Sequence, residues 1–136
     1  MKILIGTNII LDVLLNRAPW VTDSQSIWDA CDKGKATGYV TATTLTNIFY
    51  IAKRATNLAQ AQQAVRLCLD TFTVCPVDQD VLERAYQIFS KDFEDDVQIA
   101  CAVLSGLDAI ITRNTADFSH AAIPVFTPAV WAARYL

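Results

Sequence analysis

Short apolar segments that alternate with longer amphipathic ones run through this chain of 136 residues. The first segment, residues 2–5 (KILI), ends at Gly6-Thr7-Asn8 and is typical of a buried strand followed by a turn. Strands and helices in alternation favour a parallel sheet with both faces covered by helices. We therefore predict an α/β fold, in which one domain (1–136) forms a three-layer α/β/α sandwich around a parallel four- or five-stranded sheet.

The bounds of these elements are predicted from apolar spacing and from capping residues. Thr43 or Thr44 can cap one helix, Asp78 can cap another, and Gly106 is placed to stop a third. The expected helices cover residues 9–17, about 22–33, about 44–54, about 58–70, about 79–90 and about 95–105, and Pro128 opens a closing helix. The expected strands cover residues 2–5, 38–41, 72–77, 108–111 and 123–126.

Composition narrows the class of protein. Apolar residues make up 53% of the chain and charged residues 18%, a balance that favours a packed core over disorder. The net charge of −3 argues against a protein that simply coats nucleic acid, whereas a nuclease that holds cations can be acidic. Charged residues interrupt every apolar run, so we expect no membrane span and a cytoplasmic protein.

The four cysteines, Cys31, Cys68, Cys75 and Cys101, form no Cys-x-x-Cys pair. The sequence has no histidine at zinc-ligand spacing from them, and each lies among apolar neighbours. We expect reduced thiols in the core, without a role in metal binding.

Polar side chains follow two of the predicted strands. Gly6-Thr7-Asn8 follows the first strand, and Thr112-Arg113-Asn114 follows the strand at 108–111. In open α/β sheets, binding sites form beyond the carboxyl ends of the strands. If these two strands are parallel, both segments lie at the same edge of the sheet.

Two helices should deliver further polar groups to that edge. The helix that starts near Asp95 precedes the strand at 108–111 and must run antiparallel to it, so its N-terminus lies level with that strand's carboxyl end. The helix near Thr44 follows a strand, so its first turn lies at the same edge. We therefore expect one rim to hold the acids Asp92, Glu94, Asp95, Asp96 and Asp117 together with Asn47 and Asn114.

Several carboxylates at one place repel one another, and a divalent cation among them relieves the repulsion. A set of oxygen ligands without cysteine or histidine suits Mg²⁺ or Mn²⁺. The predicted rim is therefore a candidate metal site.

Three stretches resemble the PIN-domain family, which includes the ribonuclease toxins of VapC-type toxin–antitoxin pairs. They are ILIGTNIILDVLLNR at the start, DFEDDVQIACAVLSGLDAIITRN, and NTADF followed by IPVFTP. No one of these motifs is strong, but their order and spacing together are specific, and the resemblance covers essentially the whole chain. It implies Mg²⁺- or Mn²⁺-dependent hydrolysis of RNA, an antitoxin partner that covers the acidic cleft, and a homodimer.

The resemblance also implies roles for single residues. Asp95 matches the acid at the helix start, Asn114 matches the polar position after the later strand, Asp117 lies close by, and Asp92 is an additional acid. Asp95, Asp92 and Asp117 are thus the implied metal ligands and, with Asn114, the implied catalytic residues. The implied neighbours, which would support the site or contact substrate, are Thr7, Asn8, Asn47, Thr112 and Arg113, and Arg113 is the best placed cation for a phosphate.

The sequence departs from the family pattern at two places. Gly6 stands where the family has its first aspartate, and Asn47 is the nearest match to a glutamate that the family often has. Losing a metal ligand weakens metal binding and misplaces the water that it activates. We therefore expect this chain to be inactive or strongly impaired as a nuclease, whether the glycine is natural or introduced.

Plainer interpretations stay open beside these. Gly6 can be a turn glycine, Asp95 and Asp96 can serve the helix dipole alone, and Asp117 and Asn114 can be turn residues. A non-catalytic PIN-like module that binds RNA or protein is the main alternative function. A phosphatase-like hydrolase ranks last, because the Asp-x-Asp pair that it needs is missing.

Overall fold

The computed structural model describes residues 1–136, and its centre is a five-stranded sheet in the order β3-β2-β1-β4-β5. Every strand pairing in this sheet is parallel. The predicted parallel α/β architecture is therefore confirmed, with five strands. The strands are β1 (Lys2–Ile5), β2 (Thr37–Thr41), β3 (Thr73–Cys75), β4 (Ala109–Ile111) and β5 (Val125–Phe126).

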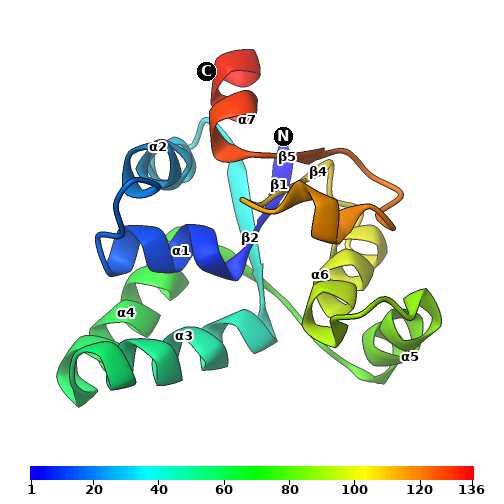
Figure 1. Ribbon diagram of the computed structural model, residues 1–136, viewed down its shortest axis with the longest axis horizontal. Helices are drawn as coiled ribbons and strands as arrows, with labels where there is room; N and C mark the ends of the chain where they lie inside the picture. Colours follow the sequence, from blue (N-terminus) through cyan, green and yellow to red (C-terminus); the bar gives the residue numbers. More distant parts are fainter.

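Helices cover both faces of the sheet, with α1 to α4 on one side and α5 and α6 on the other (Figure 1). The C-terminal helix α7 packs on α2. No helix is long and apolar enough to cross a bilayer. The helices are α1 (Thr7–Leu14), α2 (Val21–Asp32), α3 (Ala42–Ala55), α4 (Leu58–Thr71), α5 (Gln79–Ile88), α6 (Phe93–Leu104) and α7 (Pro128–Tyr135), with a short 3-10 helix η1 (Thr115–Phe118).

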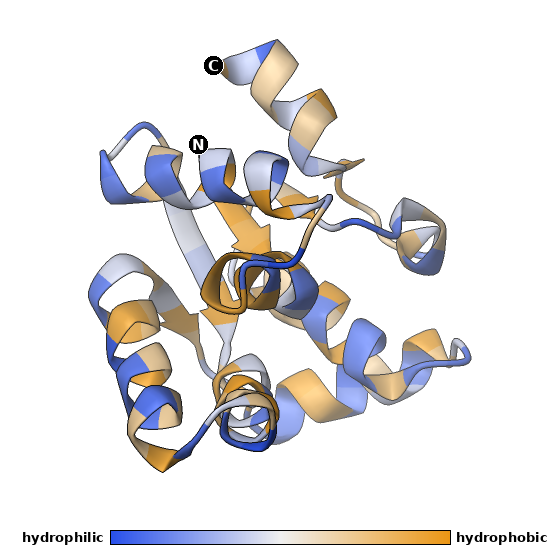
Figure 2. Ribbon diagram, turned by 60° about the vertical axis from the view of Figure 1, so that its left-hand side comes forward, coloured by the Kyte–Doolittle hydropathy of each residue, from blue (hydrophilic) through white to orange (hydrophobic).

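Alternation along the strands divides the core into two hydrophobic clusters. In β1, Ile3 and Ile5 belong to the cluster under α1 to α4, and Leu4 belongs to the cluster under α5 and α6. Successive strand side chains point to opposite faces, and all three are at most 1% exposed. Orange, hydrophobic strand segments accordingly lie at the centre of the ribbon in Figure 2. Burial on both faces explains the uninterrupted apolar run of β1.

Several predicted bounds shift because backbone groups find other partners. Thr41 caps α3, since its Oγ1 accepts the N–H of Thr44 at 3.1 Å, so the expected cap at Thr43 or Thr44 is wrong. Helix α1 starts at Thr7, two residues earlier than expected, because Gly6 is already its N-cap. The strand expected at 72–77 is short, since Pro76 has no N–H to donate to a ladder.

The four cysteines are buried and free, as expected. Burial raises the pKa of Cys31, Cys68 and Cys101 to about 12. Thiols with so high a pKa stay protonated near neutral pH and are poor nucleophiles and poor metal ligands.

The strand order places a crevice beside β1. From β1 the chain first winds outward through β2 and β3, and later returns to the other side through β4 and β5. Ligands bind at such a switch point, beyond the carboxyl ends of the strands. Ile5 pairs with Ile111, and the Gly6 N–H donates to the Ile111 carbonyl at 2.9 Å, so the ends of β1 and β4 are held together there.

Candidate active site

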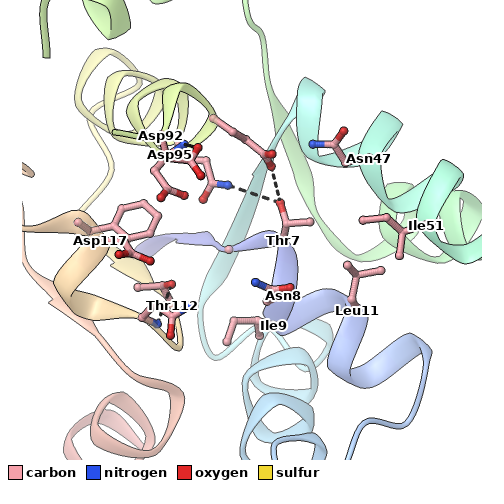
Figure 3. Close-up of a pocket in the computed structure, with 15 residues that line it drawn as sticks. Thr7, Asn8, Ile9, Leu11, Asn47, Ile51, Asp92, Asp95, Thr112 and Asp117 are labelled. Carbon is pink, nitrogen blue, oxygen red and sulfur yellow. Dashed lines mark hydrogen bonds between the residues drawn. The ribbon is translucent and has the colours of Figure 1, made fainter. Parts of the chain in front are cut away.

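A polar pocket of about 450 Å³ lies beyond the carboxyl ends of β1 and β4 (Figure 3). Four separate segments form it: the start of α1, the middle of α3 at Asn47 and Ile51, the start of α6 and the segment from Thr112 to Phe118. Distant parts of the chain thus meet at one rim. The predicted site residues that line the pocket are Gly6, Thr7, Asn8, Asn47, Asp92, Asp95, Thr112, Asn114 and Asp117.

The acids at the start of α6 have different tasks. Asp92 is the N-cap, and its Oδ1 accepts the N–H of Asp95 at 3.2 Å. Asp96 is only 1% exposed and accepts both the N–H and the hydroxyl of Ser90, at 3.0 and 2.6 Å. Glu94 accepts the Thr7 hydroxyl at 3.3 Å. The carboxylates of Asp95 and Asp117, in contrast, accept no hydrogen bond from a side chain or from a backbone N–H.

The charges of these acids converge on Asp95. Burial raises the pKa of Asp95 to about 6, and the negative charges of Asp92, Asp117, Glu94 and Asp96 add to the rise. Asp117, which comes from η1, is therefore close enough to act on a carboxyl from the start of α6. An acid that is raised in this way within a cleft is typical of a functional site.

We predict that Asp95→Asn stabilises the folded protein near pH 7. The pKa of Asp95 is higher in the folded state than its ordinary value of 3.8, so its contribution to stability is most favourable below about pH 4 and is lost as the pH rises through about 6. Because Asp95 is partly exposed, we expect a gain of about 1–2 kcal/mol from removing the charge. Urea unfolding of both proteins at several pH values measures it, and an equal difference near pH 4 and pH 7 would contradict the assignment.

A hydrogen-bonded network behind the pocket was not anticipated from the sequence. The hydroxyls of Thr7 and Thr44 lie 2.9 Å apart, and the Gln98 amide donates to Thr7 Oγ1 at 3.5 Å. Gln98 is 3% exposed, and its Oε1 has no partner. A glutamine one turn after Asp95, on the apolar side of α6, was the signal that could have revealed it. The network fixes Thr7, the residue that follows Gly6.

Arg113 was expected to contact a substrate phosphate, but its guanidinium is held elsewhere. Its Nε lies 2.9 Å from Asp12 Oδ2, and its guanidinium carbon lies 4.1 Å from the ring centre of Trp20. It does not line the pocket. The buried carboxylate of Asp12, which is 0% exposed, attracts the guanidinium away from the acids of the rim.

Gly6 has a backbone that any residue can adopt. Its φ of −66° and ψ of 150° are ordinary extended values, so a turn conformation does not explain the glycine. A Cβ at this position would meet the Ile111 carbonyl oxygen at 3.2 Å and Thr112 Cβ at 3.7 Å. To admit a side chain, the Ile111 backbone carbonyl must give by a few tenths of an ångström.

The donors present match a divalent cation in type but not in number. They are carboxylate, amide and hydroxyl oxygens, the ligands that Mg²⁺ and Mn²⁺ take. However, no three Asp, Glu, His or Cys side chains converge closely enough to hold a metal ion. The residues present therefore do not form a complete site, and Gly6, at the end of β1, adds no side chain to it.

This parallel α/β fold with an acidic pocket at its switch point has known counterparts. The family model of the PIN domain matches residues 2–116. The chain belongs to the PIN domain family. This membership leaves the phosphatase-like alternative without support. No curated protein matches the chain.

Three solved structures illustrate the structural similarity. A toxin–antitoxin complex from Klebsiella pneumoniae is 29% identical, with a TM-score of 0.69 over 92% of this chain and 96% of that one. VapBC2 from Rickettsia felis, bound to a DNA fragment from its promoter, is 14% identical, with a TM-score of 0.73 over 92% and 97%. VapC20 from Mycobacterium tuberculosis, a sarcin–ricin loop cleaving toxin, is 15% identical, with a TM-score of 0.66 over 79% and 86%. At 14% and 15% identity the likeness shows the fold alone.

Proposed function

We propose that this chain is the toxin of a toxin–antitoxin pair, built as a Mg²⁺- or Mn²⁺-dependent endoribonuclease that acts in the cytoplasm. We propose further that its activity is absent or strongly reduced because Gly6 replaces a metal-binding aspartate. The supporting observation is that Asp95, Asp117 and Asp92 line one pocket, which Gly6 also lines, and that the charges of Asp92 and Asp117 act on Asp95.

The proposed chemistry explains why one residue matters so much. In metal-dependent hydrolysis of a phosphodiester, the cation supplies an activated water. Asp95, Asp92 and Asp117 are the carboxylates that this chain offers to such a cation, and Asn114 and Asn47 add neutral oxygens at the rim. One oxygen of Asp92 is already used as the cap of α6, so a carboxylate at position 6 would add a ligand that no other contact occupies.

The test is to restore the carboxylate with Gly6→Asp and to assay cleavage of RNA. Cleavage that requires Mg²⁺ or Mn²⁺ and stops with EDTA supports the proposal. If Gly6→Asp cleaves no RNA with either metal, although it folds like the parent protein, the proposal fails.

The proposed protein partners are an antitoxin and a second copy of the chain. A toxin–antitoxin complex among the similar structures, at 29% identity, supports the first. Exposed apolar side chains on α3 and α4, including Tyr50 at 62% and Leu58 at 49%, support a protein-binding surface. Light scattering of the isolated chain and co-purification with the product of an adjacent gene test the two partners separately.

A non-catalytic PIN-like module that binds RNA or protein is the second candidate function. It is favoured by Gly6 and by the lack of three converging metal ligands. Metal-dependent cleavage by Gly6→Asp supports the enzyme, whereas tight RNA binding without any cleavage supports the module.

A further inference from the structure

Residues 89–91, in the segment that joins α5 to α6, expose an aromatic ring two residues before Lys91. Phe89 is 77% exposed and has a left-handed φ of 54°. Both features are unfavourable for phenylalanine in an isolated chain, since the ring is left in water and the backbone conformation is one that non-glycine residues avoid. The left-handed backbone belongs to the C-cap of α5, where the Phe89 N–H donates to the Ala85 carbonyl at 3.5 Å, but burial does not explain the exposed ring.

Phe89 lies beside another exposed aromatic side chain. The ring of Tyr86, which is 66% exposed, meets it edge-on with 5.9 Å between ring centres. Exposed aromatic side chains grouped in this way are uncommon on a surface without a binding role. They are the side chains on which unpaired nucleic-acid bases stack.

The same segment places a positive charge next to the acids. A second cavity of about 330 Å³ shares Asp95 and Asp117 with the acidic pocket, and Lys91, Ser90 and His120 also line it. Lys91 Nζ lies 3.8 Å from Asp117 Oδ1, and its side chain is 86% exposed. Because Arg113 is held by Asp12, the positively charged side chain next to the acids is Lys91, which lines the second cavity.

We infer that residues 89–91 carry a single-stranded RNA away from the acidic pocket, with a phosphate on Lys91 and an unpaired base stacked on Phe89. This inference rests on the proposed function. An anionic strand is repelled by the acids that surround Asp95, so it needs a cation where it leaves them. At the second cavity a phosphate would take the place of Asp117 as the partner of the exposed Lys91 ammonium group, and Phe89, two residues before Lys91, offers the next base a surface.

The test measures binding rather than cleavage. The unaltered chain, in which Gly6 limits cleavage, is titrated into a fluorescein-labelled single-stranded RNA of random sequence, about 12 nucleotides long, and anisotropy is recorded at several salt concentrations. Phe89→Leu keeps an apolar side chain and removes the ring, and it should weaken binding about tenfold. Lys91→Gln should reduce the slope of log K against log[salt] by about 0.7, the value for one phosphate on a single strand.

Matched controls come from surfaces far from the pocket. Tyr135→Leu removes an exposed ring from α7, and Lys33→Gln removes an exposed lysine after α2, so both should bind like the unaltered chain. Unchanged affinity in Phe89→Leu, or an unchanged salt slope in Lys91→Gln, overturns the inference. So does a chain that binds no RNA in low salt, or a Phe89→Leu protein that loses self-association while its RNA affinity stays the same.

The inference and the proposed function can fail independently. Cleavage by Gly6→Asp with normal RNA binding by Phe89→Leu and Lys91→Gln rejects the path at 89–91 and keeps the nuclease. Weakened binding in both variants without any cleavage by Gly6→Asp keeps the path and rejects the nuclease.

Discussion

Gly6→Asp is expected to raise the rate of RNA cleavage in Mg²⁺ or Mn²⁺ by at least about 100-fold over the unaltered chain. The φ of −66° at this position suits aspartate, and the nearest obstacle to a Cβ is the Ile111 carbonyl oxygen at 3.2 Å. The new carboxylate would add a charged ligand at the open edge of the pocket that Asp95 and Asp117 line. Initial rates on a fluorogenic RNA, with calorimetric titration of Mn²⁺, measure the two effects together.

Controls separate charge from shape in this experiment. Gly6→Asn has nearly the same shape without the charge and should stay within about tenfold of the unaltered chain. Adding Asp95→Asn to Gly6→Asp should return the rate to that of the unaltered chain, because Asp95 is the proposed ligand from α6 in the same site. A gain of equal size in Gly6→Asn would show that bulk, and not a metal ligand, is what the site lacks.

Asp12→Ala is expected to destabilise the protein by about 3 kcal/mol, the largest loss that we predict for one substitution. Asp12 is 0% exposed and accepts the hydroxyl of Ser24 at 3.1 Å. It also lies 2.9 Å from Arg113 Nε and 3.9 Å from Arg17 Nη1. Removing it leaves the half-buried guanidinium of Arg113 without a counter-charge. The midpoint of urea unfolding, at constant m-value, measures the loss.

A surface ion pair provides the comparison for Asp12. Asp70 pairs with Arg66 at 2.9 Å, but both side chains are at least 60% exposed. Asp70→Ala should therefore change stability by no more than about 0.5 kcal/mol. Equal losses in Asp12→Ala and Asp70→Ala would show that burial of Asp12 does not set its importance.

Asp12 also helps to position the pocket residues in the segment after β4. Arg113 is flanked by Thr112 and Asn114, which line the pocket, so the ion pair between Asp12 and Arg113 anchors their backbone. In a Gly6→Asp background, Asp12→Ala should lower the rate of cleavage as well as stability, and Arg113→Ala should do the same. A full rate in either variant, at a temperature where it is folded, would remove this positioning role.

The gathering of acids at one rim could be predicted without coordinates. Periodicity and turn residues indicate alternating strands and helices, and the direction of the chain in a parallel sheet then requires that the end of β1, the end of β4 and the start of α6 meet. The pocket contains Gly6, Asp95 and Asp117, as that argument required. Segment direction depends on short-range patterns, so the printed sequence is sufficient for it.

The pairing of single side chains could not be predicted in this way. Arg113 adjoins the pocket in sequence but turns to Asp12, which lies 101 residues away in the chain. Asp96 looks like Asp95 in the sequence, yet its carboxylate is buried against Ser90 while that of Asp95 lines the pocket. Which partner a charge meets depends on burial and on elements brought together by folding, and neither follows from local periodicity.

From its sequence alone, this chain is determined to be a parallel α/β protein with an acidic rim, because apolar spacing and strand direction are properties of the chain itself, while the PIN type was implied by the resemblance of its motifs. Only the tertiary structure decided that Gly6 has a backbone open to aspartate, that Arg113 is held by a buried carboxylate, and that Lys91 lies exposed beside the acids, two residues after the exposed ring of Phe89. These features arise from the packing of distant segments, which sets the exposure, the backbone angles and the charge neighbours of each residue.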